Sequence, residues 1–340
     1  MINVNTVNNY KDMLSRQFEY LRISVTDRCN YRCSYCMPAE IFNKDYSYIK
    51  QNKILSYEEI IQISLILKKV GLKKIRITGG EPLLRKNIDK LIYKLKTEVG
   101  IEHVSMTTNG SLLTDEKLSL LKSSGLDSVT LSLDTLNSDK IIKINGTKKQ
   151  FNLDKVLQGI EKYFGKVKTN TVVIKGINDN EILDIIIKMI EINSEVRFIE
   201  YMDVGESNNW NIEKVIPSKD ILKSINSRYS LSLINTDKSS TAEKWSIENT
   251  NTSVGFISSI TEPFCSGCNR ARLSVDGKLY TCLFANEGYD LKTIIRNGAS
   301  EKDVLNYFQN IWSKRSDRYS ELRFINKSDL PKVEMSYIGG

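Results

Sequence analysis

The chain has 340 residues, a hydrophobic fraction of 40% and a formal net charge of +8 at pH 7. This composition suits a soluble globular protein with one barrel-sized domain and an appendage. No apolar run approaches membrane-spanning length, and Met1 to Lys11 lacks the profile of a signal peptide, so we expect a cytoplasmic protein. The lysines are scattered without a compact basic block, which argues against a nucleic-acid binder.

The six cysteines and the single histidine restrict the chemistry that this chain can perform. In a reducing compartment, six cysteines favour metal binding or catalysis over disulfides. A histidine base, a Ser-His pair or a His-ligated metal would all depend on His103, whose place at the start of an expected strand favours a structural role. We therefore expect a bound cofactor to perform the difficult chemical step.

Strand and helix patterns alternate through the first two thirds of the chain. Helical spacing predicts helices between the strands, and Ser56 with Glu59 forms a capping-box pattern at the start of the first helix. About six strand–helix units are fewer than the eight of a closed barrel. The fold class is therefore α/β, an incomplete, open TIM-type barrel with a parallel sheet. The strands are predicted near 21–25, 75–78, 104–107, 129–133, 167–173 and 196–202.

The alternation within these strands also predicts what lines the barrel. Helices cover the outside, so the apolar positions of each strand point outward and the polar positions point inward. Burying several cations without partners is costly, so we expect a wet, cationic cavity for an anionic ligand. The residues assigned to the interior are Arg22, Ser24, Arg76, Thr78, Thr107, Thr130, Ser132, Lys168 and Arg197.

Cys29, Cys33 and Cys36 lie within eight residues, just after the first expected strand. Soft thiolates grouped in this way bind zinc or iron–sulfur clusters. Structural zinc usually takes four protein ligands, and no nearby residue offers a fourth. A cubane cluster held by three thiolates keeps one iron open for another ligand. A zinc site with a distant ligand and three ordinary buried thiols are the alternatives.

The pattern breaks between about Gly205 and Thr241, around a helix near 218–225, and we divide the chain into domains 1–235 and 236–340. The second domain is expected to be a mostly antiparallel β appendage, with strands near 253–260, 271–275 and 278–282. Asp276-Gly277 is a hairpin signal between the last two strands.

The appendage contains the remaining cysteines, Cys265, Cys268 and Cys282, again three thiols without a nearby histidine. This set favours a second cluster, with zinc ligated by Asp or Glu as the alternative.

Two pairs of glycines complete the motifs. Gly79-Gly80 follows the second expected strand, where glycines let a ligand approach the main chain closely. Gly339-Gly340 closes the sequence. Such a segment is either a flexible tail or a slender one that can thread into a narrow cavity.

Together these motifs resemble a known family. The segments are TDRCNYRCSYCMP from Thr26, TGGEP from Thr78, TTNG from Thr107, SLD from Ser132 and CSGCNRARLS from Cys265. With the final Gly-Gly, they are similar to those of molybdenum cofactor biosynthesis protein A (MoaA). That family consists of GTP 3′,8-cyclases of the radical S-adenosylmethionine (SAM) superfamily, and the similarity spans nearly the whole chain.

The resemblance implies two [4Fe-4S] clusters, one on each set of three cysteines. The first would cleave SAM to a 5′-deoxyadenosyl radical, and the open iron of the second would take the purine of GTP. The radical would remove the ribose 3′ hydrogen, and C3′ would attack C8 of the base. The positions matching SAM contacts are Tyr35, Gly80, Ser132 and Met202. Those matching GTP contacts are Arg22, Arg76, Thr107, Lys168, Arg197, Arg270, Ala271 and Arg272.

The resemblance also implies partners. These are an external electron donor and a downstream cyclic pyranopterin monophosphate synthase, with no nucleic acid and no membrane; a homodimer is compatible with it. No side-chain acid or base is expected, and Gly339 and Gly340 are suspected to act at the site. The alternative function is that of another radical SAM enzyme with an auxiliary cluster, acting on a peptide or other substrate. The cationic interior favours phosphates instead.

Overall fold

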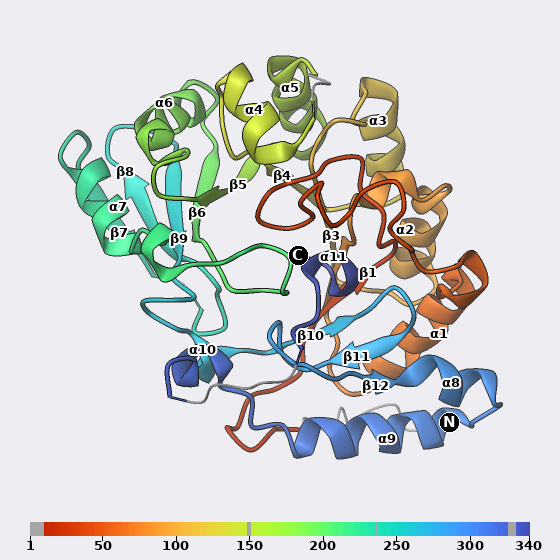
Figure 1. Ribbon diagram of the computed structural model, residues 1–340. Helices are drawn as coiled ribbons and strands as arrows, with labels where there is room; N and C mark the ends of the chain where they lie inside the picture. The colour runs from red at the N-terminus through yellow and green to blue at the C-terminus, as the bar shows by residue number, and fades with distance from the viewer. Residues whose placement is uncertain (1–9, 148–150, 236, 326–330) are drawn as a thin grey trace.

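The computed structural model describes residues 10–147, 151–235, 237–325 and 331–340 of the chain. Strands and helices alternate in its first part, and Figure 1 shows the helices outside a curved sheet. The predicted open barrel of six units is confirmed. Its strands are β1 (Tyr20–Ser24), β2 (Lys74–Thr78), β3 (His103–Thr108), β4 (Ser128–Ser132), β5 (Lys168–Val173) and β6 (Glu195–Glu200). Its helices are α1 (Tyr57–Lys68), α2 (Ile88–Thr97), α3 (Asp115–Ser123), α4 (Ser138–Asn145), α5 (Leu153–Phe164) and α6 (Ile182–Glu191).

The remaining strands extend the same sheet at both edges. They are β7 (Leu231–Ile234), β8 (Glu243–Ile247), β9 (Ser253–Ile257), β10 (Arg270–Leu273), β11 (Lys278–Tyr280) and β12 (Tyr289–Asp290). The strand order is β12-β11-β10-β1-β2-β3-β4-β5-β6-β9-β8-β7, so the sheet does not close on itself. The division at residue 235 stays a prediction, and β7 and β8, on either side of it, are neighbours in this one sheet.

Most strand pairs of the C-terminal part are antiparallel as expected, but two are parallel. The hairpin between β10 and β11 is antiparallel as predicted, and so is the pair β8–β9. However, β10 pairs in parallel with β1, and β9 pairs in parallel with β6. A strand in a sheet has two edges, and local sequence reports only the hairpin partner, so the second, long-range partner was missed.

The C-terminal part also contains helices. One of them, α7 (Ser218–Asn226), was predicted; the others are α8 (Leu291–Arg296), α9 (Glu301–Ser313), α10 (Tyr319–Leu322) and α11 (Met335–Ile338). A signal for α9 was present, because Ser300 and Asp303 form a capping box. The short 3-10 helices are η1 (Gln51–Lys53), η2 (Pro82–Leu84), η3 (Asp179–Glu181), η4 (Ile212–Lys214) and η5 (Cys265–Gly267).

The core lies between the outer face of the sheet and the helices. Alternate strand residues are fully buried there, for example Leu21, Ile23, Ile75 and Ile77, all 0% exposed. Successive strand side chains point to opposite faces, so the polar residues between them face the interior of the barrel. Among the described residues, no helix is both long enough and apolar enough to cross a membrane.

A test of this fold concerns the start of α1. The Ser56 hydroxyl accepts a hydrogen bond from Glu59 N at 3.1 Å, and the Glu59 carboxylate accepts one from Ser56 N at 2.7 Å. Ser56→Ala removes the first bond, so we expect the free energy of unfolding to fall by about 1 kcal/mol in urea denaturation. The control Ser123→Ala lies exposed near the end of α3 and should change it by less than about 0.5 kcal/mol. Equal losses would contradict the capping role.

Candidate active site

The inward-facing residues of β10, β1 and β2 form layers across the strands. In one layer Tyr20 lies beside Arg270. Two residues further along the strands, Arg22 lies between Arg272 on β10 and Arg76 on β2. Three guanidinium groups thus start from neighbouring positions on one face of the sheet, which concentrates positive charge there.

These residues line a cavity inside the barrel. Its lining contains five arginines and, among the described residues, no aspartate or glutamate. Nε of Arg22 and Oδ1 of Asn170 are buried, and neither has a hydrogen-bond partner in the described part of the chain. Buried polar atoms are normally paired, so the lining suits a polar, negatively charged ligand. The arginines are Arg22, Arg76, Arg197, Arg270 and Arg272.

The charges in this cavity are crowded. Arg76 Nε donates to the Tyr20 hydroxyl at 2.6 Å, and its Nη1 donates to Thr107 Oγ1 at 3.2 Å. Burial and repulsion by Arg76 lower the pKa of Arg22 to about 10. Burial alone would raise the pKa of Tyr20, but Arg76 and Arg22 outweigh it and lower that pKa to about 8. A bound anion would relieve this repulsion between cations.

The first three cysteines lie in the loop that follows β1. Cys33 O accepts a hydrogen bond from Cys36 N at 3.0 Å, and Asn145 Nδ2 donates to Cys33 Sγ at 3.3 Å. Burial raises the pKa of Cys29 to about 11, and burial with the nearby Asp134 carboxylate raises that of Cys33. Metal coordination deprotonates such thiols outright, so this donor set fits an iron–sulfur cluster.

The second three cysteines lie at the opposite end of the same strands. Cys268 precedes the start of β10, whereas Cys29 follows the end of β1, its parallel neighbour. Cys282 follows β11, which runs back antiparallel to β10. Burial raises the pKa of Cys282 to about 12; in Cys268 the effect of burial is outweighed by Arg270 and Arg315, which lower its pKa to about 6. The arginine layers therefore lie between the two sets of thiols.

Neither set of thiols is arranged for a single metal ion. Among the described residues, no three His, Cys, Asp or Glu side chains are grouped so that they could hold one. Zinc–sulfur bonds of about 2.3 Å require ligand sulfurs about 4 Å apart.

Comparisons with known proteins show the family of this chain. The Radical SAM superfamily matches residues 23–188, and the family Molybdenum Cofactor Synthesis C matches residues 194–321. The chain is 43% identical over 338 residues to the GTP 3′,8-cyclase of Staphylococcus epidermidis, covering 97% of this chain and 98% of that protein. For the GTP 3′,8-cyclase of Aquifex aeolicus the identity is 42% over 332 residues, with 97% and 99% covered. The chain belongs to the GTP 3′,8-cyclase family of radical SAM enzymes.

Solved structures agree on the fold. The SAM-bound crystal structure of Streptococcus suis SuiB superposes with a TM-score of 0.60 over 92% of this chain and 69% of that one. Its sequence identity is 16%, so this likeness concerns the fold alone.

Two of the positions that the family resemblance assigns to SAM, Tyr35 and Gly80, lie in or beside the loop of the first three cysteines. Tyr35 and Met202 line the cavity, and the Tyr35 hydroxyl donates to Asp134 at 2.8 Å. Gly80 lies so close to the Arg28 carbonyl that a side chain would collide with it. Ser132 is the last residue of β4. The contacts of these positions with SAM stay predictions.

The expected GTP-contacting positions fall into two groups. The arginines line the cavity, and Thr107 accepts a hydrogen bond from one of them. Lys168 is half-buried on β5 but is not part of the cavity lining. The Ala271 side chain is 1% exposed and packs into the core on the outer face, because it alternates with Arg270 and Arg272. Only its main chain could face a ligand.

Several residues of the site were missed by the sequence analysis. Tyr20 and Asn170 both line the cavity. Tyr20 lies two residues before Arg22, and Asn170 lies two residues after Lys168. Residues two apart in a strand share a face, so the same pattern could have assigned both to the interior. Asn145, which donates to Cys33 Sγ, has no such signal, because only the packing of α4 beside the cysteine loop brings them together.

The Gly-Gly segment lies inside the barrel, so of the two expectations the threading segment is the one observed. Gly340 lines the cavity, Gly339 is buried, and Arg272 Nη1 donates to the Gly339 carbonyl. The Glu334 carboxylate anchors the segment by accepting hydrogen bonds from Glu206 N at 3.0 Å and Ser207 N at 3.1 Å. Figure 1 shows the C-terminus and α11 at the centre of the molecule.

Gly339→Ala tests whether this placement matters. Gly339 has φ +79°, and an added Cβ would lie 1.9 Å from Thr78 Oγ1. We expect the segment to be displaced and turnover to fall by about tenfold or more, because misplacement within a site is costly. Gly298 is a matched control, since it has the same φ of +79° and nothing within 4 Å of an added Cβ. Product formation and iron content are measured in both alanine variants. Equal turnover would show that the segment is dispensable.

Proposed function

We propose that this chain is a radical SAM GTP 3′,8-cyclase. It converts GTP to (8S)-3′,8-cyclo-7,8-dihydroguanosine 5′-triphosphate in the first step of molybdenum cofactor biosynthesis. The observation that carries the proposal is the arginine-lined cavity between two sets of three thiols. The near full-length identity to cyclases of this family supports it.

Each set of thiols would hold one [4Fe-4S] cluster, the first being Cys29, Cys33 and Cys36 and the second Cys265, Cys268 and Cys282. When bound, the first cluster and SAM supply the radical that removes the ribose 3′ hydrogen, which no side chain can supply.

The chain's own residues bind and orient the nucleotide. Arg22, Arg76 and Arg272 lie in one layer and offer planar forks of N–H donors that match phosphate oxygens. From the layer of Arg270 to that of Ser24 the strands rise by four residues, or about 13 Å. A nucleotide held by these arginines would therefore span the space between the two sets of cysteines, with its ribose kept from water.

The electron would come from an external donor, and the product would pass to a downstream cyclic pyranopterin monophosphate synthase. We place both reactions in the cytoplasm, in line with the six free thiols of this chain.

A second candidate is a radical SAM enzyme with an auxiliary cluster that modifies a peptide. The SuiB structure bound to the precursor peptide SuiA superposes with a TM-score of 0.58, at 16% identity over 92% of this chain and 68% of that one. This likeness extends to the fold only. The arginine-lined cavity favours phosphate over a peptide main chain, which carries no net charge.

Two cysteine variants separate the two sets of thiols. Cys33→Ala should abolish cleavage of SAM, because the two remaining thiolates cannot retain the first cluster. Cys282→Ala should leave reductive cleavage of SAM largely intact and eliminate the cyclised product. The measurement is 5′-deoxyadenosine and cyclic product by chromatography under anaerobic conditions, with iron and sulfide assayed in each variant. Equal loss of 5′-deoxyadenosine, with the first cluster present in both, would refute this division of roles.

The affinity for GTP tests the cavity. Charge-assisted hydrogen bonds contribute about 1.5–3 kcal/mol each, so Arg22→Ala and Arg270→Ala should each weaken GTP binding roughly ten- to a hundredfold. Lysine at either position should restore only part of the affinity, because the planar fork is lost. SAM binding should barely change. The exposed Arg228 provides a control, and Arg228→Ala should bind GTP as the unmodified chain does. Unchanged affinity in both cavity variants would place the triphosphate elsewhere.

A further inference from the structure

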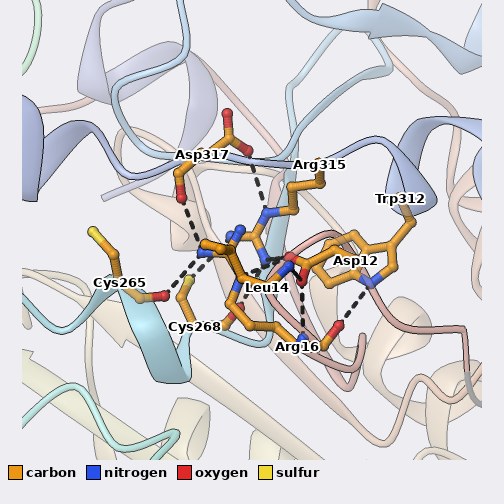
Figure 2. Close-up of polar contacts among 8 residues, drawn as sticks. All are labelled: Asp12, Leu14, Arg16, Cys265, Cys268, Trp312, Arg315 and Asp317. Atoms are coloured by element: carbon orange, nitrogen blue, oxygen red, sulfur yellow. Dashed lines mark hydrogen bonds and ion pairs between the residues drawn. The ribbon is translucent and has the colours of Figure 1, made fainter. Parts of the chain in front are cut away.

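Arg315, two residues beyond the end of α9, is buried. It lies against Cys268 of the second set of cysteines (Figure 2). Its Nη2 donates to Cys268 Sγ at 3.3 Å, and its Nη1 donates to the Cys268 carbonyl at 2.7 Å. The side chain is 1% exposed, and its guanidinium lies 4.5 Å from the centre of the Trp312 ring. A cation is thus held in a fixed orientation on the sulfur of one proposed cluster ligand.

A buried carboxylate holds Arg315 and a second arginine in place. Asp12 Oδ2 accepts a hydrogen bond from Arg16 Nε at 2.6 Å and one from Arg315 Nη1 at 3.3 Å. Arg16 Nη1 in turn donates to the Cys265 carbonyl at 2.9 Å, as Figure 2 shows. Arginines from distant parts of the chain therefore bind two of the three cysteines, Cys265 through its carbonyl and Cys268 through its carbonyl and its sulfur. Asp12 and Arg16 precede residue 23, where the first family match begins.

The position of Arg315 has an electrostatic consequence. Hydrogen bonds to the ligating sulfurs and burial are among the factors that set the reduction potential of an iron–sulfur cluster. A fixed cation at a thiolate favours the cluster state that carries one more electron. Asp317 accepts a hydrogen bond from Arg315 Nε at 3.2 Å, but its side chain is 30% exposed, so water screens its charge more than that of Arg315.

We propose that Arg315 is a positioning residue that raises the reduction potential of the second cluster through its charged N–H···S bond to Cys268. This inference rests on the proposed function, because it requires a cluster on Cys265, Cys268 and Cys282. The reduction in question adds one electron to that cluster, from its 2+ to its 1+ state, and in the test the electron comes from the titrating reductant.

The experiment is a potentiometric titration of the anaerobically reconstituted full chain, followed by electron paramagnetic resonance. The signal of the first cluster is identified by its change when SAM is added. In Arg315→Gln we expect the equilibrium constant for reduction of the second cluster to fall about tenfold. This equals a fall of about 59 mV in the potential of a one-electron couple. The potential of the first cluster should not move, which provides an internal control.

Two further variants separate the electrostatic role from a structural one. Asp317→Asn removes a negative charge that pairs with Arg315 and also acts on Cys282, so the potential of the second cluster should rise. Lys314→Gln removes an exposed cation directly before Arg315 in the chain and should leave the potential unchanged. If Arg315 were merely structural, its loss would remove the cluster without shifting the potential. A fall in potential in Arg315→Gln and a rise in Asp317→Asn would exclude that role.

Each outcome decides between the possibilities. Arg315→Gln with both clusters and an unchanged second potential overturns the inference. If Arg315→Gln loses the second cluster, Asp317→Asn decides, and an unchanged potential in that variant also overturns it. If the unmodified chain holds iron and sulfide for one cluster only, the proposed function fails at that point, before any arginine variant is compared.

Discussion

The parallel pairing of β10 with β1 is the interaction on which the site depends. It brings a segment from residue 270 onward against the first strand of the barrel, in a register that sets Arg272 beside Arg22 and Arg270 beside Tyr20. The same pairing fixes the loop of Cys265 and Cys268 at one end of the strands, while the loop after β1 carries the other cysteines at the opposite end. One pair of strands thus sets both the charge of the cavity and the separation of its two proposed clusters.

The cost of this arrangement is repulsion between buried cations. Arg272 is among the buried residues, and its pKa is lowered by burial and by Arg22 and Arg270. Part of that cost is offset inside the protein, since Arg76 binds Tyr20 and Arg272 binds the Gly339 carbonyl. A bound anion would relieve the remainder. Because the buried cations repel one another, binding of an anion would also stabilise this sheet.

The second set of cysteines is held by a different kind of contact. There Asp12 lies between Arg16 and Arg315, and Nη groups of the two arginines reach two carbonyls and a sulfur of the cysteine loop. Paired buried ions are costly to separate, so they hold geometry well. The cavity arginines differ in that no aspartate or glutamate of the described residues is part of the lining they share.

The sequence by itself determined the features that depend on a short repeat or spacing of residues, namely the strands, their two faces and the cysteine motifs. The alternation of apolar and polar residues, as in Leu21 to Val25, predicted six strands and the face of the sheet on which each side chain lies. It could do so because successive side chains of a strand point to opposite faces. The spacing of the cysteines and the family resemblance predicted the chemistry. Tertiary structure alone decided that β10 lies beside β1, that β9 lies beside β6, that Asn145 meets Cys33, and that Arg315 meets Cys268. These contacts join residues tens to hundreds of positions apart, and their partners depend on which strand edges and helix faces remain uncovered once the barrel has formed, a condition that no local pattern encodes.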